Sequence, residues 1–91
     1  MYQVSTTPHF ERRLTRFIRR HPRLAGRLGR VITSLEADPF QPQLELHPLR
    51  GELGGLHAVS LTQAYRIVLR LDADRHEIVL RDIGSHDEVY R

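Results

Sequence analysis

The first part of the chain carries hydrophobic residues at helical spacing. A short strand is predicted over residues 2–6, and Thr7-Pro8 then provides a helix N-cap followed by proline at the first helical position. Apolar side chains recur three and four residues apart in two stretches, which His21-Pro22 separates and Asp38-Pro39 ends. The two stripes are Phe10, Leu14, Phe17 and Ile18, then Leu24, Leu28, Val31, Ile32 and Leu35. The pattern predicts two amphipathic helices that form a hairpin.

After Pro39 the hydrophobic period becomes two, which is typical of β-strands. Strands are predicted over residues 44–49, 56–61, 65–71 and 77–83, with turn-forming residues between them. On the third of these, Ile67, Leu69 and Leu71 share one face, and Arg66, Val68 and Arg70 share the other. We therefore expect an α+β fold with an N-terminal strand, a helical hairpin and an antiparallel β-meander. The helices should cover the Ile67 face and leave the Arg66 face open, and residues 84–90 should form a polar tail beyond the last strand.

Length and composition limit the classes of protein to consider. The 91 residues and 10.6 kDa fit one domain over residues 1–91, and 40% hydrophobic with 27% charged residues is a globular composition. No apolar run is long enough to cross a bilayer, and the start lacks the order of a signal peptide, so we expect a cytoplasmic protein without a membrane partner. The absence of cysteine excludes disulfides, thiolate metal sites and a cysteine nucleophile.

The basic side chains are unusual in kind and in placement. All 14 are arginine, which excludes a lysine general base or Schiff base. Residues 11–30 hold eight arginines against Glu11, a charge of +7, and because the whole chain carries +3 the remainder carries −4. This asymmetry favours a polyanionic partner, nucleic acid or an acidic polypeptide; the alternative is a merely solvated helix face.

The sequence lacks the common catalytic motifs but holds a group of polar side chains on the predicted open face. No phosphate-binding loop, dinucleotide fingerprint, zinc-protease motif or nucleophile elbow occurs, and no helical pair of histidines at metal-ligand spacing is present, so we expect no metal and no cofactor. The remaining group comprises His47, Arg50, Arg66, Arg70, Arg81, His86 and Tyr90. Arginine binds phosphate, histidine moves a proton near neutral pH, and tyrosine stacks on a base or shares a proton.

These side chains are the parts that metal-free RNA cleavage needs. Attack of a ribose 2′-OH on the neighbouring phosphate requires a base, positive charge at the phosphorane and an acid for the leaving 5′-oxygen. His47 or His86 would serve as base or acid, and Arg66 would supply the charge. Structural roles stay open: His47 at a strand end, and His86 with Tyr90 as a terminal plug. An arginine inside an apolar strand, by contrast, must find an anion or solvent.

Four short motifs, together with the order of elements, resemble a known family. They are His47-Pro-Leu-Arg50-Gly51, the following Gly54-Gly55-Leu56, Tyr65-Arg66-Ile67-Val68 and the ending Ile83-Gly84-Ser-His86-Asp-Glu-Val-Tyr90. Over essentially the whole chain, the sequence resembles the RelE/ParE superfamily of type II toxins, and within it the YafQ-like branch. The Tyr-Arg-Ile strand and the Gly-Ser-His ending are the most specific pieces.

The resemblance implies a ribosome-dependent mRNA endonuclease that a cognate antitoxin neutralises. The family's catalytic positions correspond to His47, Arg66, His86 and Tyr90. Ser60 stands where the YafQ branch has a histidine, Ala64 stands where it has an aspartate, and the lysines that RelE itself uses are absent. The implied partners are the antitoxin, the ribosome and mRNA, with RNA contacts expected from Arg50, Ser60, Arg70, Arg81, Arg12, Arg16 and Arg20.

Two other classes of function share this fold. One is a ParE-like gyrase poison without nuclease chemistry, which does not need His86 or Tyr90 near the chain end. The other is a binding module whose arginines only hold RNA or a peptide. The presence of His86 and Tyr90 favours the nuclease, but fold resemblance alone does not decide, because function belongs to the site.

Overall fold

The computed structural model describes residues 1–90. It begins with strand β1 (Gln3–Thr6) and helix α1 (Pro8–Arg20), and a 3-10 turn then leads into helix α2 (Ala25–Ala37). Four strands follow, β2 (His47–Pro48), β3 (His57–Ser60), β4 (Tyr65–Asp72) and β5 (Glu77–Ser85), before the short C-terminal helix α3 (His86–Val89). No helix in this described part is long and apolar enough to cross a membrane.

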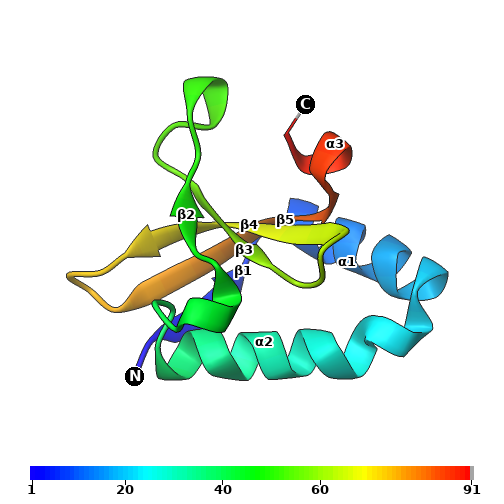
Figure 1. Cartoon of the computed structure of the whole chain (residues 1–91), viewed down its shortest axis with the longest axis horizontal. Coiled ribbons are helices and arrows are strands. Elements are labelled where there is room, and N and C mark those ends of the chain that lie inside the picture. Colours follow the sequence, from blue (N-terminus) through cyan, green and yellow to red (C-terminus); the bar gives the residue numbers. More distant parts are fainter. Residues whose placement is uncertain (91) are drawn as a thin grey trace.

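One five-stranded sheet, in the order β1-β5-β4-β3-β2, organises the fold (Figure 1). Strands β2 to β5 pair antiparallel, as the meander prediction requires, and β1 joins β5 in parallel. A parallel pair needs a long connection between its strands, and here α1, α2 and strands β2 to β4 all lie between β1 and β5 in the chain. The α+β class, the N-terminal strand, the two helices and the antiparallel strands are therefore confirmed.

Helix α1 begins where its sequence predicts. The Thr7 hydroxyl accepts a hydrogen bond from the Phe10 amide at 3.1 Å, and Pro8 occupies the first helical position. Its apolar stripe buries Phe10 and Phe17, and α2 buries Leu28 and Leu35 in the same way. Both helices thus deliver their predicted stripes to the core.

The core lies between these helices and one face of the sheet. The sheet contributes buried aliphatic side chains from its three central strands, with Ile67, Leu69, Ile78 and Leu80 all fully buried. Helix α2 runs along this side of the sheet, whereas α3 and the turn Gly51–Leu53 rise on the opposite side (Figure 1). The Ile67 face is therefore covered by the helices, as predicted, although Leu71 at its end is only half-buried.

Two sequence predictions about the outer parts of the sheet are wrong. Residues 44–49 do not form a full strand, because a 3-10 turn occupies Pro42–Leu44 and Glu45 adopts a left-handed backbone with φ of 53°. Only His47–Pro48 pairs with β3, and proline has no amide to extend the ladder.

The Arg66 face is also less open than predicted. Val68 and Ala58 on that face are 2% and 0% exposed, and Val89 of α3 is 4% exposed. Helix α3 packs against β4 and β5, so the chain end is a folded cover with one apolar anchor and does not simply project beyond the sheet. The residue that anchors the chain end is Val89, whereas His86, which the plug interpretation named together with Tyr90, is exposed and Tyr90 is half-buried.

Candidate active site on the open face of the sheet

The strand register places three of the predicted site residues on the same sheet face. His47 lies opposite Ala58, which lies opposite Val68; Ser60 lies opposite Arg66 in the adjacent row. Directly opposed residues point to the same side of a sheet, as do residues two apart along a strand. From strand spacing and rise, the Cα atoms of His47 and Arg66 are about 12 Å apart. A ligand of nucleotide size lying across β3 would reach both side chains.

Arg66 is held by the turn that joins β3 to β4. Its Nη1 atom donates to the carbonyl oxygens of Thr62, Gln63 and Tyr65, at 2.6, 3.0 and 3.2 Å. The Ser60 hydroxyl donates to the same Thr62 oxygen at 2.9 Å. Among residues 1–90, Nε and Nη2 of Arg66 have no hydrogen-bond acceptor, so one side of the guanidinium is anchored and the other is available to an anion.

A capping box fixes the start of α3. The Ser85 hydroxyl accepts from the Glu88 amide at 3.3 Å, and the Glu88 carboxylate accepts from the Ser85 amide at 2.8 Å. These bonds make the backbone turn sharply after β5. The His86 and Tyr90 rings then meet edge to face, with centroids 4.3 Å apart and planes at 88°.

Tyr90 brings the tail to Arg66. Burial raises the pKa of the Tyr90 phenol, and the nearby positive charge of Arg66 partly opposes this rise. The phenol is therefore protonated at neutral pH and acts as a hydrogen-bond donor. Its oxygen is buried and has no hydrogen-bond partner within residues 1–90. A buried hydroxyl without a partner costs about 1–3 kcal/mol, which a ligand acceptor would recover.

A pocket of about 400 Å³ opens beside Tyr90. Its other walls come from the loop between β2 and β3, with Leu49, Arg50, Glu52 and Leu53. Sequence reasoning identified Arg50 and Tyr90 but missed the two leucines and the glutamate. The available signal was the loop framed by Gly51, Gly54 and Gly55, in which Gly51 and Gly55 have positive φ and bend the chain toward the tail.

His47 is exposed at the outer edge of the same face. Its Nδ1 atom lies 2.9 Å from the Glu45 carbonyl oxygen. Because a carbonyl only accepts, Nδ1 must carry the proton, and in neutral imidazole this leaves Nε2 as a proton acceptor. His47 thus has the tautomer that a general base needs, while it also makes the turn contact considered in the sequence interpretation.

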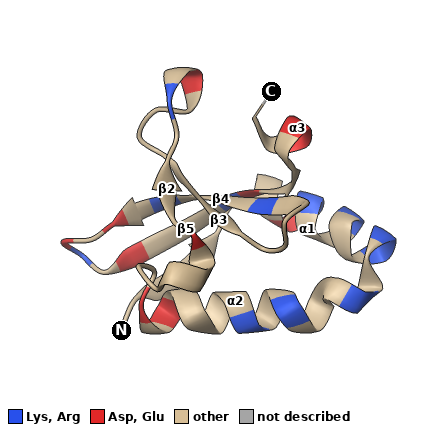
Figure 2. Ribbon diagram, in the orientation of Figure 1, with Lys and Arg blue, Asp and Glu red and all other residues tan. Residues whose placement is uncertain are grey.

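The predicted RNA-contacting arginines divide into two groups. Arg70 is exposed on the Arg66 face, and Arg81 is exposed at the bulge where the β4–β5 register shifts. The arginines of α1 and α2 form a separate basic region, visible as blue segments along both helices (Figure 2). Within it Arg12 is exposed, and Arg16 and Arg20 line a cleft with Glu88. The α1 arginines nevertheless border the Arg66 face, because Arg13 pairs with Asp82 and the cleft is lined by Gly84, which lies opposite Arg66 in the β4–β5 pair.

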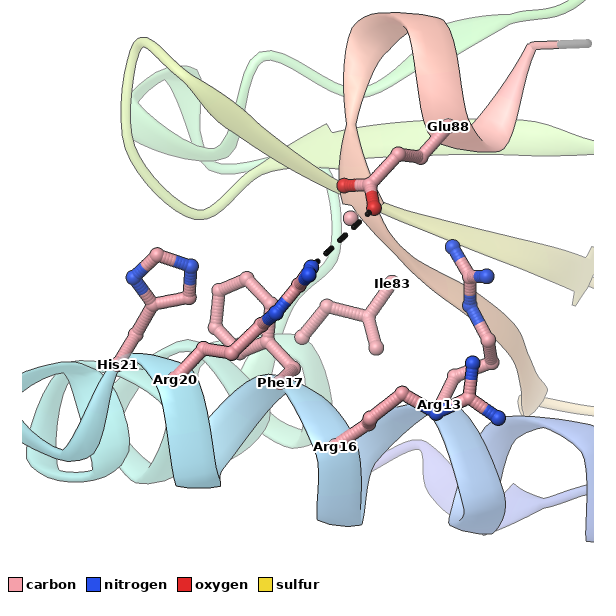
Figure 3. A pocket seen from close by; sticks show the side chains of 8 residues that line it. Arg13, Arg16, Phe17, Arg20, His21, Ile83 and Glu88 are labelled. Atoms are coloured by element: carbon pink, nitrogen blue, oxygen red, sulfur yellow. Dashed lines mark ion pairs between the residues drawn. The ribbon is translucent and has the colours of Figure 1, made fainter.

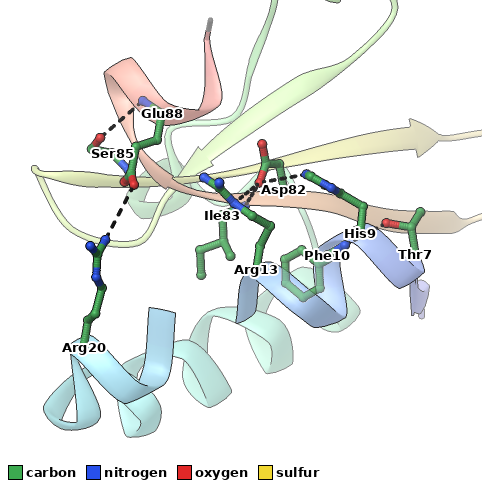
Figure 4. A network of polar contacts seen from close by, with 9 residues as sticks. All are labelled: Thr7, His9, Phe10, Arg13, Arg20, Asp82, Ile83, Ser85 and Glu88. Atoms are coloured by element: carbon green, nitrogen blue, oxygen red, sulfur yellow. Dashed lines mark hydrogen bonds and ion pairs between the residues drawn. The ribbon is translucent and has the colours of Figure 1, made fainter. Parts of the chain in front are cut away.

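A polar network that sequence reasoning missed joins α1 to the end of β5 (Figure 4). Asp82 pairs with Arg13 at 3.1 Å and with His9 at 3.5 Å, and Glu88 lies 3.9 Å from Arg20. Periodicity marks these residues only as polar and does not tell which of them meet. Within residues 1–90, no cluster of three or more potential ligands would hold a metal ion.

The sequence matches no protein-family model, and no curated protein sequence matches it significantly. Solved structures do match it. A mutant of YafQ from Escherichia coli has 14% identity and a TM-score of 0.84 over 100% of both chains. A YoeB/ParE toxin from Agrobacterium tumefaciens has 19% identity and a TM-score of 0.76 over 94% of this chain and 99% of that one. A chain of the RelBE2 toxin–antitoxin complex from Mycobacterium tuberculosis has 23% identity and a TM-score of 0.74, over 93% and 98%.

These similarities show that the chain has the same fold as the YafQ, YoeB/ParE and RelBE2 structures. The YafQ structure shares this fold along the entire length of both chains.

Proposed function

We propose that this protein is the toxin of a type II toxin–antitoxin system and acts as a ribosome-dependent mRNA endonuclease. The observation that carries the proposal is that Tyr90, whose ring contacts His86, lies within electrostatic reach of Arg66 in a chain with the fold of known toxins. Arg66 has an anchored side and an available side, Tyr90 is a protonated donor, and His86 contacts Tyr90. A gyrase poison of the same fold has no need of this chemistry.

The proposed reaction is cleavage by the 2′-OH of the substrate. A histidine accepts the 2′-OH proton, the oxygen attacks the adjacent phosphorus, and the P–O5′ bond breaks as a proton donor protonates the leaving oxygen. Arg66 stabilises the added negative charge of the phosphorane, and no metal is required for any of these steps. The products carry a 2′,3′-cyclic phosphate, or after hydrolysis a 3′-phosphate, and a 5′-hydroxyl.

The contacts of these residues support different roles at the two ends of the site. The Nδ1 contact of His47 leaves Nε2 to accept a proton, which suits the base. Tyr90 is half-buried with a buried phenol oxygen and a raised pKa, which suits the donor side together with His86 at the surface. Ser60 hydrogen bonds the Thr62 carbonyl, so its role is to support the turn that holds Arg66. Arg50 lines the pocket beside Tyr90 and Arg70 is exposed on the Arg66 face, which supports a role for both in contacting the RNA backbone.

The proposed partners are a cognate antitoxin, the ribosome and its mRNA. Support for an antitoxin comes from the toxin–antitoxin complex among the structural matches. Support for the ribosome and mRNA comes from the positive charge of residues 11–30, which suits a polyanionic surface.

Cleavage mapping on programmed ribosomes tests the proposal. The wild-type protein should cut mRNA in the ribosomal A site, also with enough EDTA to remove trace transition metals while magnesium stays in excess. Tyr90→Phe should cut more slowly yet be at least as stable, because the lost hydroxyl has no partner in the fold. Inhibition of DNA gyrase supercoiling without RNA cleavage would establish the ParE-like alternative, and RNA binding without either activity would establish a binding module.

A further inference from the structure

A second cleft, of about 240 Å³, lies between α1 and the junction of β5 with α3 (Figure 3). Arg13, Arg16 and Arg20 line its α1 side at positions i, i+3 and i+7, which a helix places on one face over about 10 Å. Glu88 faces them from α3. Gly84 allows this close approach, because a Cβ there would lie 3.0 Å from Glu88 Oε1 and 3.2 Å from Arg13 Nη2.

The arginines of the cleft are unequally neutralised. Arg13 pairs with Asp82 through Nε at 3.1 Å, and Arg20 lies 3.9 Å from Glu88 Oε2. No carboxylate within residues 1–90 lies at ion-pair distance from Arg16. The cleft thus retains excess positive charge at Arg16 and a weak, long ion pair at Arg20.

Glu88 lines the cleft as an anion at neutral pH. Its Oε1 atom accepts a hydrogen bond from the Ser85 amide, and this hydrogen bond is the main cause of the lowered pKa of Glu88. Its Oε2 atom is the one directed toward Arg20. Because the capping box holds the carboxylate in place, an incoming anion meets it as a fixed like charge.

We propose that this cleft, which borders the Arg66 face at Gly84, binds a backbone phosphate of RNA, and that Glu88 competes with that phosphate for Arg20. This inference rests on the proposed role of the α1 arginines in RNA binding. It adds the place where they bind a phosphate and the internal anion, Glu88, that competes with that phosphate. Arg16 and Arg20 would hold the phosphate oxygens, with Arg13 fixed behind them by Asp82.

The floor of the cleft favours a phosphate over an acidic peptide. Its apolar residues, Phe17 and Ile83, are only 6% and 1% exposed. A peptide segment that becomes ordered on binding needs apolar burial to offset its lost conformational entropy. Most of the accessible lining is polar or charged, so we expect binding to be mainly electrostatic and to depend strongly on salt.

Binding of a fluorescent 2′-O-methyl RNA hexamer, measured by anisotropy across a salt series, tests this inference. The hexamer has no free internal 2′-OH, so its affinity is independent of whether the protein is a nuclease. Arg16→Gln should weaken binding and lower the salt slope by about 0.7, the value of one single-strand phosphate contact. Arg75→Gln is the matched control, because Arg75 lies in the β4–β5 turn outside the cleft.

Glu88→Gln should strengthen RNA binding about two- to fivefold, because Arg20 then no longer pairs with a carboxylate and an exposed ion pair has about this value. Glutamine keeps the capping box, so the tail should remain folded. Glu77→Gln makes the same charge change outside the cleft and should have a smaller effect. Equal tightening by both glutamate variants would overturn the competition. A loss of antitoxin affinity in Arg16→Gln, with RNA affinity unchanged, would overturn the phosphate site in favour of an acidic peptide.

Discussion

The two faces of the sheet differ in burial and in polarity. On one face α1 and α2 cover fully buried aliphatic residues such as Ile67 and Leu69, and no charged or other polar residue in residues 1–90 is buried there as a whole. On the other face the four-residue helix α3 packs on β4 and β5, Arg66 and His47 stay accessible, and Tyr90 lines a pocket with the β2–β3 loop. We infer that stability comes mainly from the first face. The second face can therefore hold unsatisfied polar groups such as the Tyr90 hydroxyl.

The largest effect on stability is expected from Ile67→Ala. This change leaves a cavity in a fully buried position and should lower the free energy of unfolding by about 2–5 kcal/mol in a urea titration. Arg66→Ala, the neighbouring residue on the other face, should cost about 1 kcal/mol, because water replaces its bonds to the turn carbonyls. Equal losses in the two variants would break the division between the faces.

Arg66→Ala should instead abolish growth arrest and slow mRNA cleavage on ribosomes about 10²- to 10³-fold, as for removal of one transition-state charge contact. Arg70→Ala is the control, because Arg70 lies on the same face four residues further along β4, and it should have a weaker effect. Growth arrest by the Arg66 variant at the parent level would show that the open face does not act through this residue.

Variants of the C-terminal helix α3 test whether it contributes to the core or only covers the second face. Val89→Ala should cost about 1–2 kcal/mol, the value of two buried methylene groups. Removing residues 86–91 should eliminate cleavage and keep antitoxin binding, because the core face is complete without them. Circular dichroism monitors the fold of the shortened chain; a chain that unfolds at room temperature would make α3 part of the core instead of a cover.

The smallest effect concerns the capping box and pH. The hydrogen bond from the Ser85 amide holds the folded-state pKa of Glu88 below its ordinary value of 4.5. A lowered folded pKa contributes stability that is present above pH 4.5 and is lost as the pH falls through the folded value. The difference in Tm between wild type and Glu88→Gln should therefore be largest near neutral pH and shrink in acid. A constant difference from pH 7 to pH 3 would contradict this role.

Local chemistry predicts most of the core face. Thr7-Pro8 marks the start of α1, and the stripes ending at Ile18 and Leu35 mark the buried sides of both helices. Nonlocal geometry escapes such reasoning. The strand predicted from residue 44 fails at Glu45, whose left-handed backbone has no signature in the hydrophobic period.

On the open face, sequence identifies chemistry but not contacts. Arg66 and Tyr90 are recognisable candidates, yet their proximity depends on the turn at Ser85 and on the anchoring of Val89. Leu53 reaches its pocket because the β2–β3 loop folds beside Tyr90. Glu88 reaches its cleft because the capping box of α3 holds it near α1. The charge surplus of residues 11–30 predicts a polyanion, but only the structure shows that Arg13, Arg16 and Arg20 line a cleft beside Gly84.

The most direct test of the central claim is cleavage of an mRNA that carries one 2′-deoxy nucleotide at the mapped cut position in the ribosomal A site. We expect the wild-type protein to cut the all-ribose message and leave a 2′,3′-cyclic phosphate or 3′-phosphate. The deoxy position should resist cleavage in the same complex. Undiminished cleavage at the deoxy position would contradict a 2′-OH mechanism and with it the assigned work of the Arg66 face.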